Sequence, residues 1–168
     1  MNTLYILRHA IAVQRGSGGF TKDSDRPLTP EGREKLRRAA RAMTKLELEI
    51  DLVLTSPFVR SRQTAELVAD VLHLREKLQC SEHLTPQGKY DGLINHLKHL
   101  RPVPDGVLLV GHEPHLSGLV SLLLSGTPDL AITLKKAGLC KLTLTGLTLA
   151  RCASLDWLLT PKQLGLMA

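Results

Sequence analysis

Two arginines and two histidines stand where they could bind one anion together. Arg8 and His9 end the apolar run "LYIL", and His112 ends a second apolar run, "GVLLVG". Arg60 falls in the first turn of the helix expected after the second strand. Guanidinium and imidazole groups donate several hydrogen bonds to an oxyanion, and a phosphoryl group is the ligand that this set suits best.

The residue types also suggest a reaction. A neutral imidazole at His9 can attack phosphorus in line and form a phosphoenzyme, provided that its other ring nitrogen donates a hydrogen bond that fixes the tautomer. Arg8 and Arg60 would hold the equatorial oxygens, and His112, protonated beside phosphate, would stabilise the charge that builds up during transfer. Water would then hydrolyse the phosphoenzyme. No metal or other cofactor is expected, because these side chains supply the positive charge.

Four strands and four helices are predicted to alternate along most of the chain. Apolar runs predict the strands, and Thr29-Pro30 and Ser56-Pro57 read as a capping residue followed by a proline at the first helical position. Pro102 limits the third helix, and Pro114 opens the fourth. The predicted strands cover residues 4–7, 51–56, 77–80 and 106–112, and the first helix extends through Leu46.

From Ala137 onward the pattern changes to alternation. The alternation predicts two antiparallel strands that close the sheet, from Leu142 with Leu144, Leu147 with Leu149, and then Asp156-Trp157. The fold class is therefore α/β, a three-layer sandwich of a mostly parallel sheet with helices on both faces. Ligands of such sheets bind at the carboxyl ends of the strands, where the four candidate residues fall.

Composition predicts one globular domain over residues 1–168. The chain is 43% hydrophobic and 23% charged, and no apolar run reaches the roughly 18 residues of a membrane span. Its start lacks the features of a secretory signal, so a cytoplasmic location is expected. Three widely spaced cysteines are interpreted as free thiols. The net charge of +6 favours an acidic or phosphorylated partner and leaves nucleic acid as an alternative.

Three motifs, in order, resemble those of the histidine phosphatase superfamily: "RHA" at 8–10, "SPFVRSRQTAEL" at 56–67 and "GHEP" at 111–114. The segments "RPLTPEG", "HLTPQG" and "DWLLTPKQL" extend the resemblance over nearly the whole chain and are similar to the SixA-type phosphohistidine phosphatases. The resemblance implies a phosphoglycerate mutase-like fold and a metal-independent hydrolase, with Arg8, His9, Arg60 and His112 as its catalytic residues.

The chain departs from the superfamily pattern at two places. Ala10 stands where the motif usually has glycine, and a methyl group is tolerated there unless the position needs a positive φ. In "SEHLTP", Glu82 is the candidate general acid, although it lies one residue before His83, where the resemblance would put the acid. A phosphorylated imidazole can take up a proton on its free nitrogen and leave as neutral imidazole. A site without a clearly placed general acid therefore suits a phosphoramidate substrate.

The resulting hypothesis is a phosphatase that acts on phosphohistidine in a signalling protein, such as a histidine phosphotransfer domain. One alternative is a small-molecule phosphomonoesterase of the same superfamily. Another is a non-catalytic basic module that binds nucleic acid or an acidic protein, which the intact set of four residues disfavours. A metal site is not expected at the remaining histidines, because three ligands at a defined spacing are not apparent. A membrane partner is not expected either.

Overall fold

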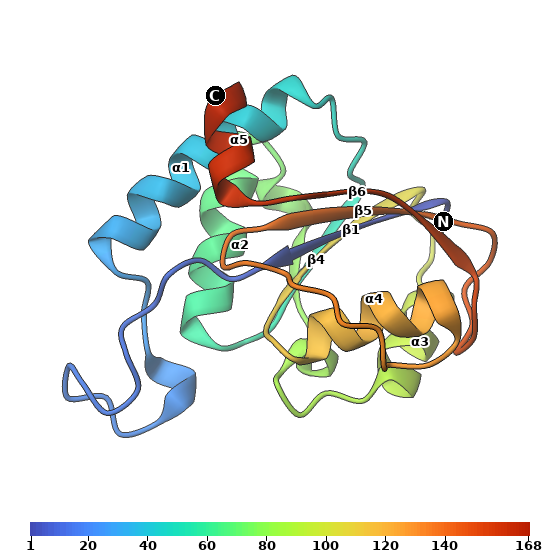
Figure 1. The fold of residues 1–168 in the computed structure, drawn as a ribbon, viewed down its shortest axis with the longest axis horizontal. Coiled ribbons are helices and arrows are strands. Elements are labelled where there is room, and N and C mark those ends of the chain that lie inside the picture. The colour runs from blue at the N-terminus through green and yellow to red at the C-terminus, as the bar shows by residue number, and fades with distance from the viewer.

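A six-stranded sheet forms the centre of the molecule (Figure 1), and the computed structural model describes all of residues 1–168. The strand order is β3-β2-β4-β1-β5-β6, with the first four strands parallel and the last two antiparallel, which confirms the predicted mixed sheet. The strands are β1 (Thr3–Arg8), β2 (Leu52–Thr55), β3 (Leu78–Cys80), β4 (Gly106–Gly111), β5 (Leu139–Leu144) and β6 (Ala153–Leu159).

Helices cover both faces of this sheet, so the three-layer arrangement is also confirmed (Figure 1). Two of them, α3 and α4, pack on one face, and the other three pack on the opposite face. The helices are α1 (Pro30–Lys45), α2 (Val59–Val71), α3 (Tyr90–Lys98), α4 (His115–Ser125) and α5 (Pro161–Met167).

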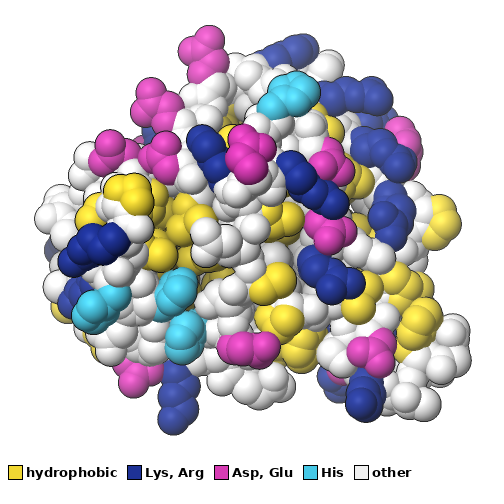
Figure 2. All heavy atoms as spheres, turned by 180° about the vertical axis from the view of Figure 1, so that it is seen from behind, with side chains coloured by type: hydrophobic (Ala, Val, Ile, Leu, Met, Phe, Trp, Pro, Cys, Tyr) yellow, Lys and Arg dark blue, Asp and Glu magenta, His cyan; other side chains and the backbone are white.

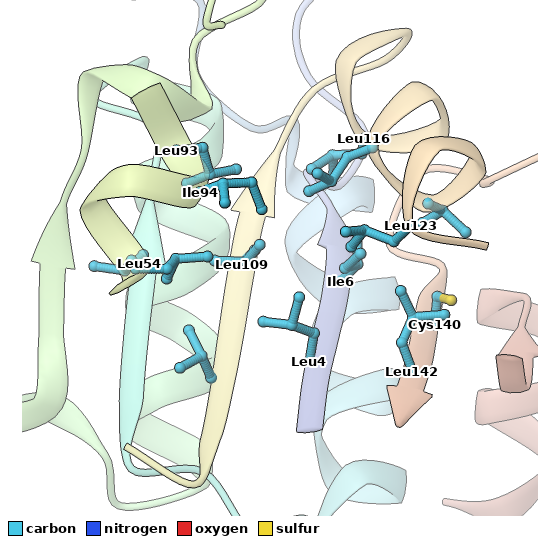
Figure 3. Close-up of a cluster of buried hydrophobic side chains, with 14 of the residues drawn as sticks. Leu4, Ile6, Leu54, Leu93, Ile94, Leu109, Leu116, Leu123, Cys140 and Leu142 are labelled. Carbon is cyan, nitrogen blue, oxygen red and sulfur yellow. The ribbon is translucent and has the colours of Figure 1, made fainter. Parts of the chain in front are cut away.

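The central strands are apolar because helices cover them on both sides. All six residues of β4 are buried, and side chains that alternate along β1 and β4 point to opposite layers. Figure 3 shows one layer, in which Ile6 and Leu109 from the sheet meet Leu116 of α4 and Ile94 of α3. This packing holds the carboxyl ends of β1 and β4 together.

The first predicted helix is confirmed, including its start. The Thr29 hydroxyl accepts a hydrogen bond from the Gly32 amide at 3.0 Å, and Pro30 occupies the first helical position. The apolar stripe of this helix, formed by Leu36, Ala39, Ala40 and Met43, is fully buried.

Three details differ from the sequence prediction. Leu147 and Leu149 lie in the connection between β5 and β6, because the first antiparallel strand already ends at Leu144. Helix α5 was not predicted, although Thr160 and Gln163 form a capping box at its start. Helix α2 begins at Val59, after a cap residue that makes no side-chain hydrogen bond, so Ser56 is not its cap.

No helix in the structure is long and apolar enough to cross a membrane. The cysteines Cys80, Cys140 and Cys152 form no disulfide, as expected.

Candidate active site

The pairing of β1 with β4 brings the two candidate histidines side by side. Arg8, the last residue of β1, is in register with Gly111, the last residue of β4. His9 and His112 therefore leave the sheet at the same edge, and their ring centroids lie 5.0 Å apart. Residues 103 positions apart in the sequence thus share one site, as the strand-end rule predicts.

His9 lies at the bottom of the site, with 7% of its surface exposed. Its Nδ1 lies 2.7 Å from the Ala10 carbonyl oxygen, which can only accept, so Nδ1 carries the proton and donates it. The other nitrogen, Nε2, keeps its lone pair and accepts a hydrogen bond from Arg60 Nε at 3.3 Å. This is the fixed tautomer that a histidine nucleophile requires. Ala10 does not adopt a positive φ, so its methyl group fits.

The terminal nitrogens of Arg60 are already occupied by Asp23, which the sequence analysis did not identify. Arg60 Nη2 forms an ion pair with Asp23 Oδ2 at 2.9 Å, and Nη1 donates to the Asp23 backbone oxygen at 2.6 Å. The same carboxylate pairs with Arg15 and Arg26. In the free site, Nε is therefore the nitrogen of Arg60 that faces His9.

Ser56, expected as a helix cap, instead contacts His112. The Ser56 hydroxyl lies 2.9 Å from His112 Nε2 and also accepts a hydrogen bond from the Phe58 amide at 3.3 Å. The serine proton is thus free to point at Nε2, which places the proton of neutral His112 on Nδ1. The Phe58 ring packs edge-on against His112 at 5.1 Å and lies 5.2 Å from the Arg60 guanidinium carbon, which fixes both side chains.

Two buried nitrogens in the site have no hydrogen-bond partner. They are His112 Nδ1 and Arg8 Nε. Arg8 is otherwise held by a 2.9 Å hydrogen bond from Nη1 to the Leu134 carbonyl. A buried donor without a partner is costly, and an oxyanion is the ligand that would satisfy both nitrogens at once.

Burial keeps both histidines neutral in the free site. It lowers the pKa of His9 to about 3, with Arg60 and Arg8 acting in the same direction against the hydrogen bond to Ala10. It lowers the pKa of His112 to about 2, and neighbouring His9 and Arg60 add to this effect. A protonated His112, as the sequence analysis assigned it, therefore requires a bound anion.

We expect both rings to remain neutral at about pH 5, where an ordinary histidine is protonated. Nitrogen-15 NMR of the imidazole nitrogens measures this, and added inorganic phosphate should raise the pKa of His112. The unfolded chain binds these protons below about pH 6.5, so the free energy of unfolding should also fall as the pH decreases from that value. Protonation of both rings near their ordinary pKa would contradict the buried arrangement.

The four predicted residues line one pocket of about 270 Å³, which we call the His9 pocket. Glu82 does not line it, because the short helical turn η3 (Glu82–Leu84) leaves this side chain exposed. The carboxyl groups at the pocket are those of Asp23 and Glu113. The full lining is Arg8, His9, Ala12, Arg15, Asp23, Arg26, Arg60, Pro86, Gln87, His112, Glu113 and Lys136.

Asp23 is held as a carboxylate. Although burial acts to raise its pKa, hydrogen bonds from Arg26 and Arg60 keep the pKa of Asp23 below its usual value. It is therefore an anchor for arginines and not a proton donor. No three His, Cys, Asp or Glu side chains are arranged to hold a metal ion, in the His9 pocket or elsewhere.

The fold and the site together define an α/β enzyme with a cationic pocket at the carboxyl edge of its sheet. Residues 4–93 match the model of the histidine phosphatase superfamily (branch 1). The chain is 36% identical over 137 residues to an uncharacterized protein of a Picosynechococcus strain, and the match covers 81% of each chain. It is 34% identical over 135 residues to the phosphohistidine phosphatase SixA of Escherichia coli, covering 77% of this chain and 80% of that one.

A solved structure supports the same assignment. The protein histidine phosphatase SixA complexed with tungstate superposes with a TM-score of 0.82 at 30% identity, covering 96% of this chain and 99% of that one. The chain belongs to the histidine phosphatase superfamily and is of the SixA type. It is a phosphatase, and the resemblance drawn from the three motifs is confirmed.

Proposed function

We propose that the chain removes the phosphoryl group from phosphohistidine in a protein, through a phosphoenzyme formed on His9. The observation that carries this proposal is the tautomer of His9. Its Nδ1 donates to the Ala10 carbonyl at 2.7 Å, so Nε2 presents a lone pair in a pocket of cations. A neutral, oriented imidazole of this kind is a nucleophile that needs no base.

The neighbouring groups fit the charge that develops during transfer. The Nε2–phosphorus bond forms while the bond from phosphorus to the leaving group breaks, and the equatorial oxygens take up negative charge. Arg8 Nε and His112 Nδ1, both unpartnered in the free site, would donate to these oxygens. Arg60 Nε, now 3.3 Å from His9 Nε2, would turn to the same oxygens. Water then attacks the phosphoenzyme and releases inorganic phosphate.

The leaving group decides which substrates this site favours. An alkoxide needs a proton donor, whereas the imidazole of phosphohistidine takes up its proton from water or departs already protonated on its free nitrogen. Asp23 is paired with three arginines, and Glu82 lies outside the His9 pocket. Neither of these two carboxyl groups can protonate an alkoxide, and this supports a phosphoramidate substrate unless Glu113, the other carboxyl group of the pocket, supplies the proton.

The comparisons support a protein as the bearer of the phosphoryl group. Of the SixA proteins that match this chain, one is named a phosphohistidine phosphatase and another a protein histidine phosphatase. We therefore assign a phosphorylated protein, such as a histidine phosphotransfer domain, as the partner. The three free cysteines fit a reducing compartment, and we place the reaction in the cytoplasm.

A comparison of kcat/KM on three substrates tests the proposal. A phosphohistidine protein should be the best substrate, an aryl phosphate intermediate and a sugar phosphate the poorest, because this order follows the ease of departure of the leaving group. Glu82→Gln should change none of the three rates by more than about twofold, since the side chain is exposed away from the pocket. A sugar phosphate turned over fastest would overturn the proposal.

One observation favours the alternative of a small-molecule phosphomonoesterase. Glu113 lines the His9 pocket, and its Oε1 accepts a hydrogen bond from the Ser117 amide at 3.0 Å, which fixes its position. A carboxyl group held there could protonate an alkoxide. If it does, Glu113→Gln should abolish hydrolysis of the sugar phosphate and spare the aryl phosphate. Under the phosphohistidine proposal the sugar phosphate is poor before and after this change.

A further inference from the structure

Two further hollows continue the His9 pocket along the surface. The first, of about 420 Å³, shares Arg8 and Lys136 with the pocket. The second, of about 410 Å³, shares Lys35 and Pro161 with the first. The three hollows therefore join edge to edge, from the carboxyl end of β1 past α1 to α5, and α1 and α5 lie together at the upper left of Figure 1.

The charged side chains that line these two hollows are all positive. Neither is lined by an aspartate or a glutamate. Lys35 pairs with Glu31, one turn earlier on α1, but the other lysines and the arginine outside the pocket make no ion pair. We call this surface the basic groove and define it by its exposed cations Lys35, Arg38, Lys135, Lys136 and Lys162.

The basic groove thus gathers four unpaired cations on one surface. Figure 2 shows the side seen from behind Figure 1, where Lys and Arg side chains alternate with Asp and Glu. Ion pairs such as Arg62 with Glu66 and Arg75 with Asp70 neutralise some of the other cations. An acidic partner would gain from contacting the basic groove, where Lys35 alone is already paired with a carboxylate.

The turn that carries Lys135 and Lys136 is fixed to the active site. The Ala137 amide donates to the Arg8 carbonyl at 3.0 Å, and Arg8 Nη1 donates to the carbonyl of buried Leu134 at 2.9 Å. Ala137 adopts a φ of 58°, a left-handed conformation that residues with a side chain rarely adopt, and this closes the turn tightly. The two lysines are thus held at a set position beside the site and are not on a free loop.

We propose that the basic groove docks an acidic surface of the protein whose phosphohistidine enters the His9 pocket. This inference rests on the proposed function, because it assigns a role to the surface around a protein-borne phosphoryl group. Arg8 and Lys136 line both the pocket and the groove, so a protein that presents its phosphohistidine to His9 also covers the groove.

The lining of the groove favours a protein over a nucleic acid. Ala10, Ile11, Ala137 and Pro161 form an apolar floor beneath the cations, and Leu166 stands 80% exposed at the far rim. No aromatic side chain lines either hollow, so bases would have no stacking surface. Carboxylates around an apolar side chain match this combination of cations and floor.

Two synthetic phosphohistidine peptides test the docking surface. Both are about 25 residues long, an extended reach that exceeds the diameter of a domain of this size. One flanks the phosphohistidine with glutamates and one apolar residue, and the other flanks it with serines and glycines. We expect kcat/KM at low salt to be about tenfold higher for the acidic peptide, with an advantage that falls as salt is added.

The charge reversal Arg38→Glu with Lys162→Glu should reduce this ratio from about ten to about one, because both residues line the groove and neither lines the His9 pocket. The matched control is Arg37→Glu with Arg41→Glu, which makes the same change in net charge on exposed positions of α1 outside the groove. The control should keep most of the ratio. An equal loss in both variants would overturn the proposal and leave only an effect of net charge.

Two other outcomes are separable. If the unaltered enzyme hydrolyses an aryl phosphate but neither peptide, the proposed function fails and the docking surface fails with it. If it hydrolyses both peptides at equal rates, the function stands and the docking surface is refuted. An oligodeoxynucleotide that inhibits the enzyme more strongly than the dephosphorylated acidic peptide would assign the groove to nucleic acid and would likewise overturn the proposal.

Discussion

Replacing His9 by alanine is expected to reduce turnover of an aryl phosphate by at least about a thousandfold, equivalent to roughly 4 kcal/mol of transition-state stabilisation. No other imidazole can replace the lost nucleophile, because His112 Nε2 is held by Ser56 at 2.9 Å. The fold should survive, since His9 is neutral and its loss leaves no buried charge unpaired. Arg60 keeps its ion pair with Asp23.

His99→Ala is the matched control, because His99 is exposed at the end of α3 and lies outside the His9 pocket. Both variants should unfold cooperatively on heating, which separates a loss of chemistry from a loss of structure. A His9→Ala enzyme that keeps more than about a tenth of its kcat would refute the assignment of the nucleophile.

The second large effect is expected for Arg60→Lys, which should lower kcat/KM by at least about tenfold, or 1.4 kcal/mol. Lysine keeps the charge but cannot hold Asp23 with two nitrogens while a third faces His9. The structure therefore gives a reason that differs from the one the sequence suggests. The fork of Arg60 is needed for its anchoring to Asp23 as much as for binding oxygens.

Arg62→Lys provides the control, because Arg62 lies one half-turn further along α2, is exposed and pairs loosely with Glu66 at 3.8 Å. Its kcat/KM should stay within about twofold of the unaltered enzyme. Comparable losses in the two variants would mean that the local charge of α2, and not the geometry of Arg60, supports the reaction.

The architecture follows from the sequence because burial on both faces makes the parallel strands continuously apolar. The apolar run of β4 predicts a core strand. Thr29-Pro30 predicts the start of α1, because Thr29 caps the helix and Pro30 suits its first position. Ser56-Pro57 carries the same local signal but does not cap α2, because the Ser56 hydroxyl is taken by His112. A tertiary contact outweighs the local pattern there.

The candidate site is predictable to the extent that strand ends define it. Arg8, His9 and His112 follow two strands whose register can be anticipated, and Arg60 follows from the helix start. Asp23 lies in the connection between β1 and α1, where no periodicity constrains the path of the chain. The sequence signal that could have identified Asp23 is the acidic turn that it shares with Asp25, which lies between Arg15 and Arg26. Glu82 looked suitable in sequence because a turn such as η3 does not reveal which way its side chains point.

The proposed mechanism requires that a phosphoryl group pass from a phosphohistidine protein to His9 Nε2. A rapid-quench experiment measures this step: a protein with isotope-labelled phosphohistidine is mixed with the enzyme and stopped in alkaline denaturant, which preserves phosphohistidine. We predict a transient label on the peptide that contains His9, absent in His9→Ala and formed no more slowly than inorganic phosphate appears. Release of labelled phosphate at the full rate without any label on His9, or with label on another residue, would contradict this mechanism.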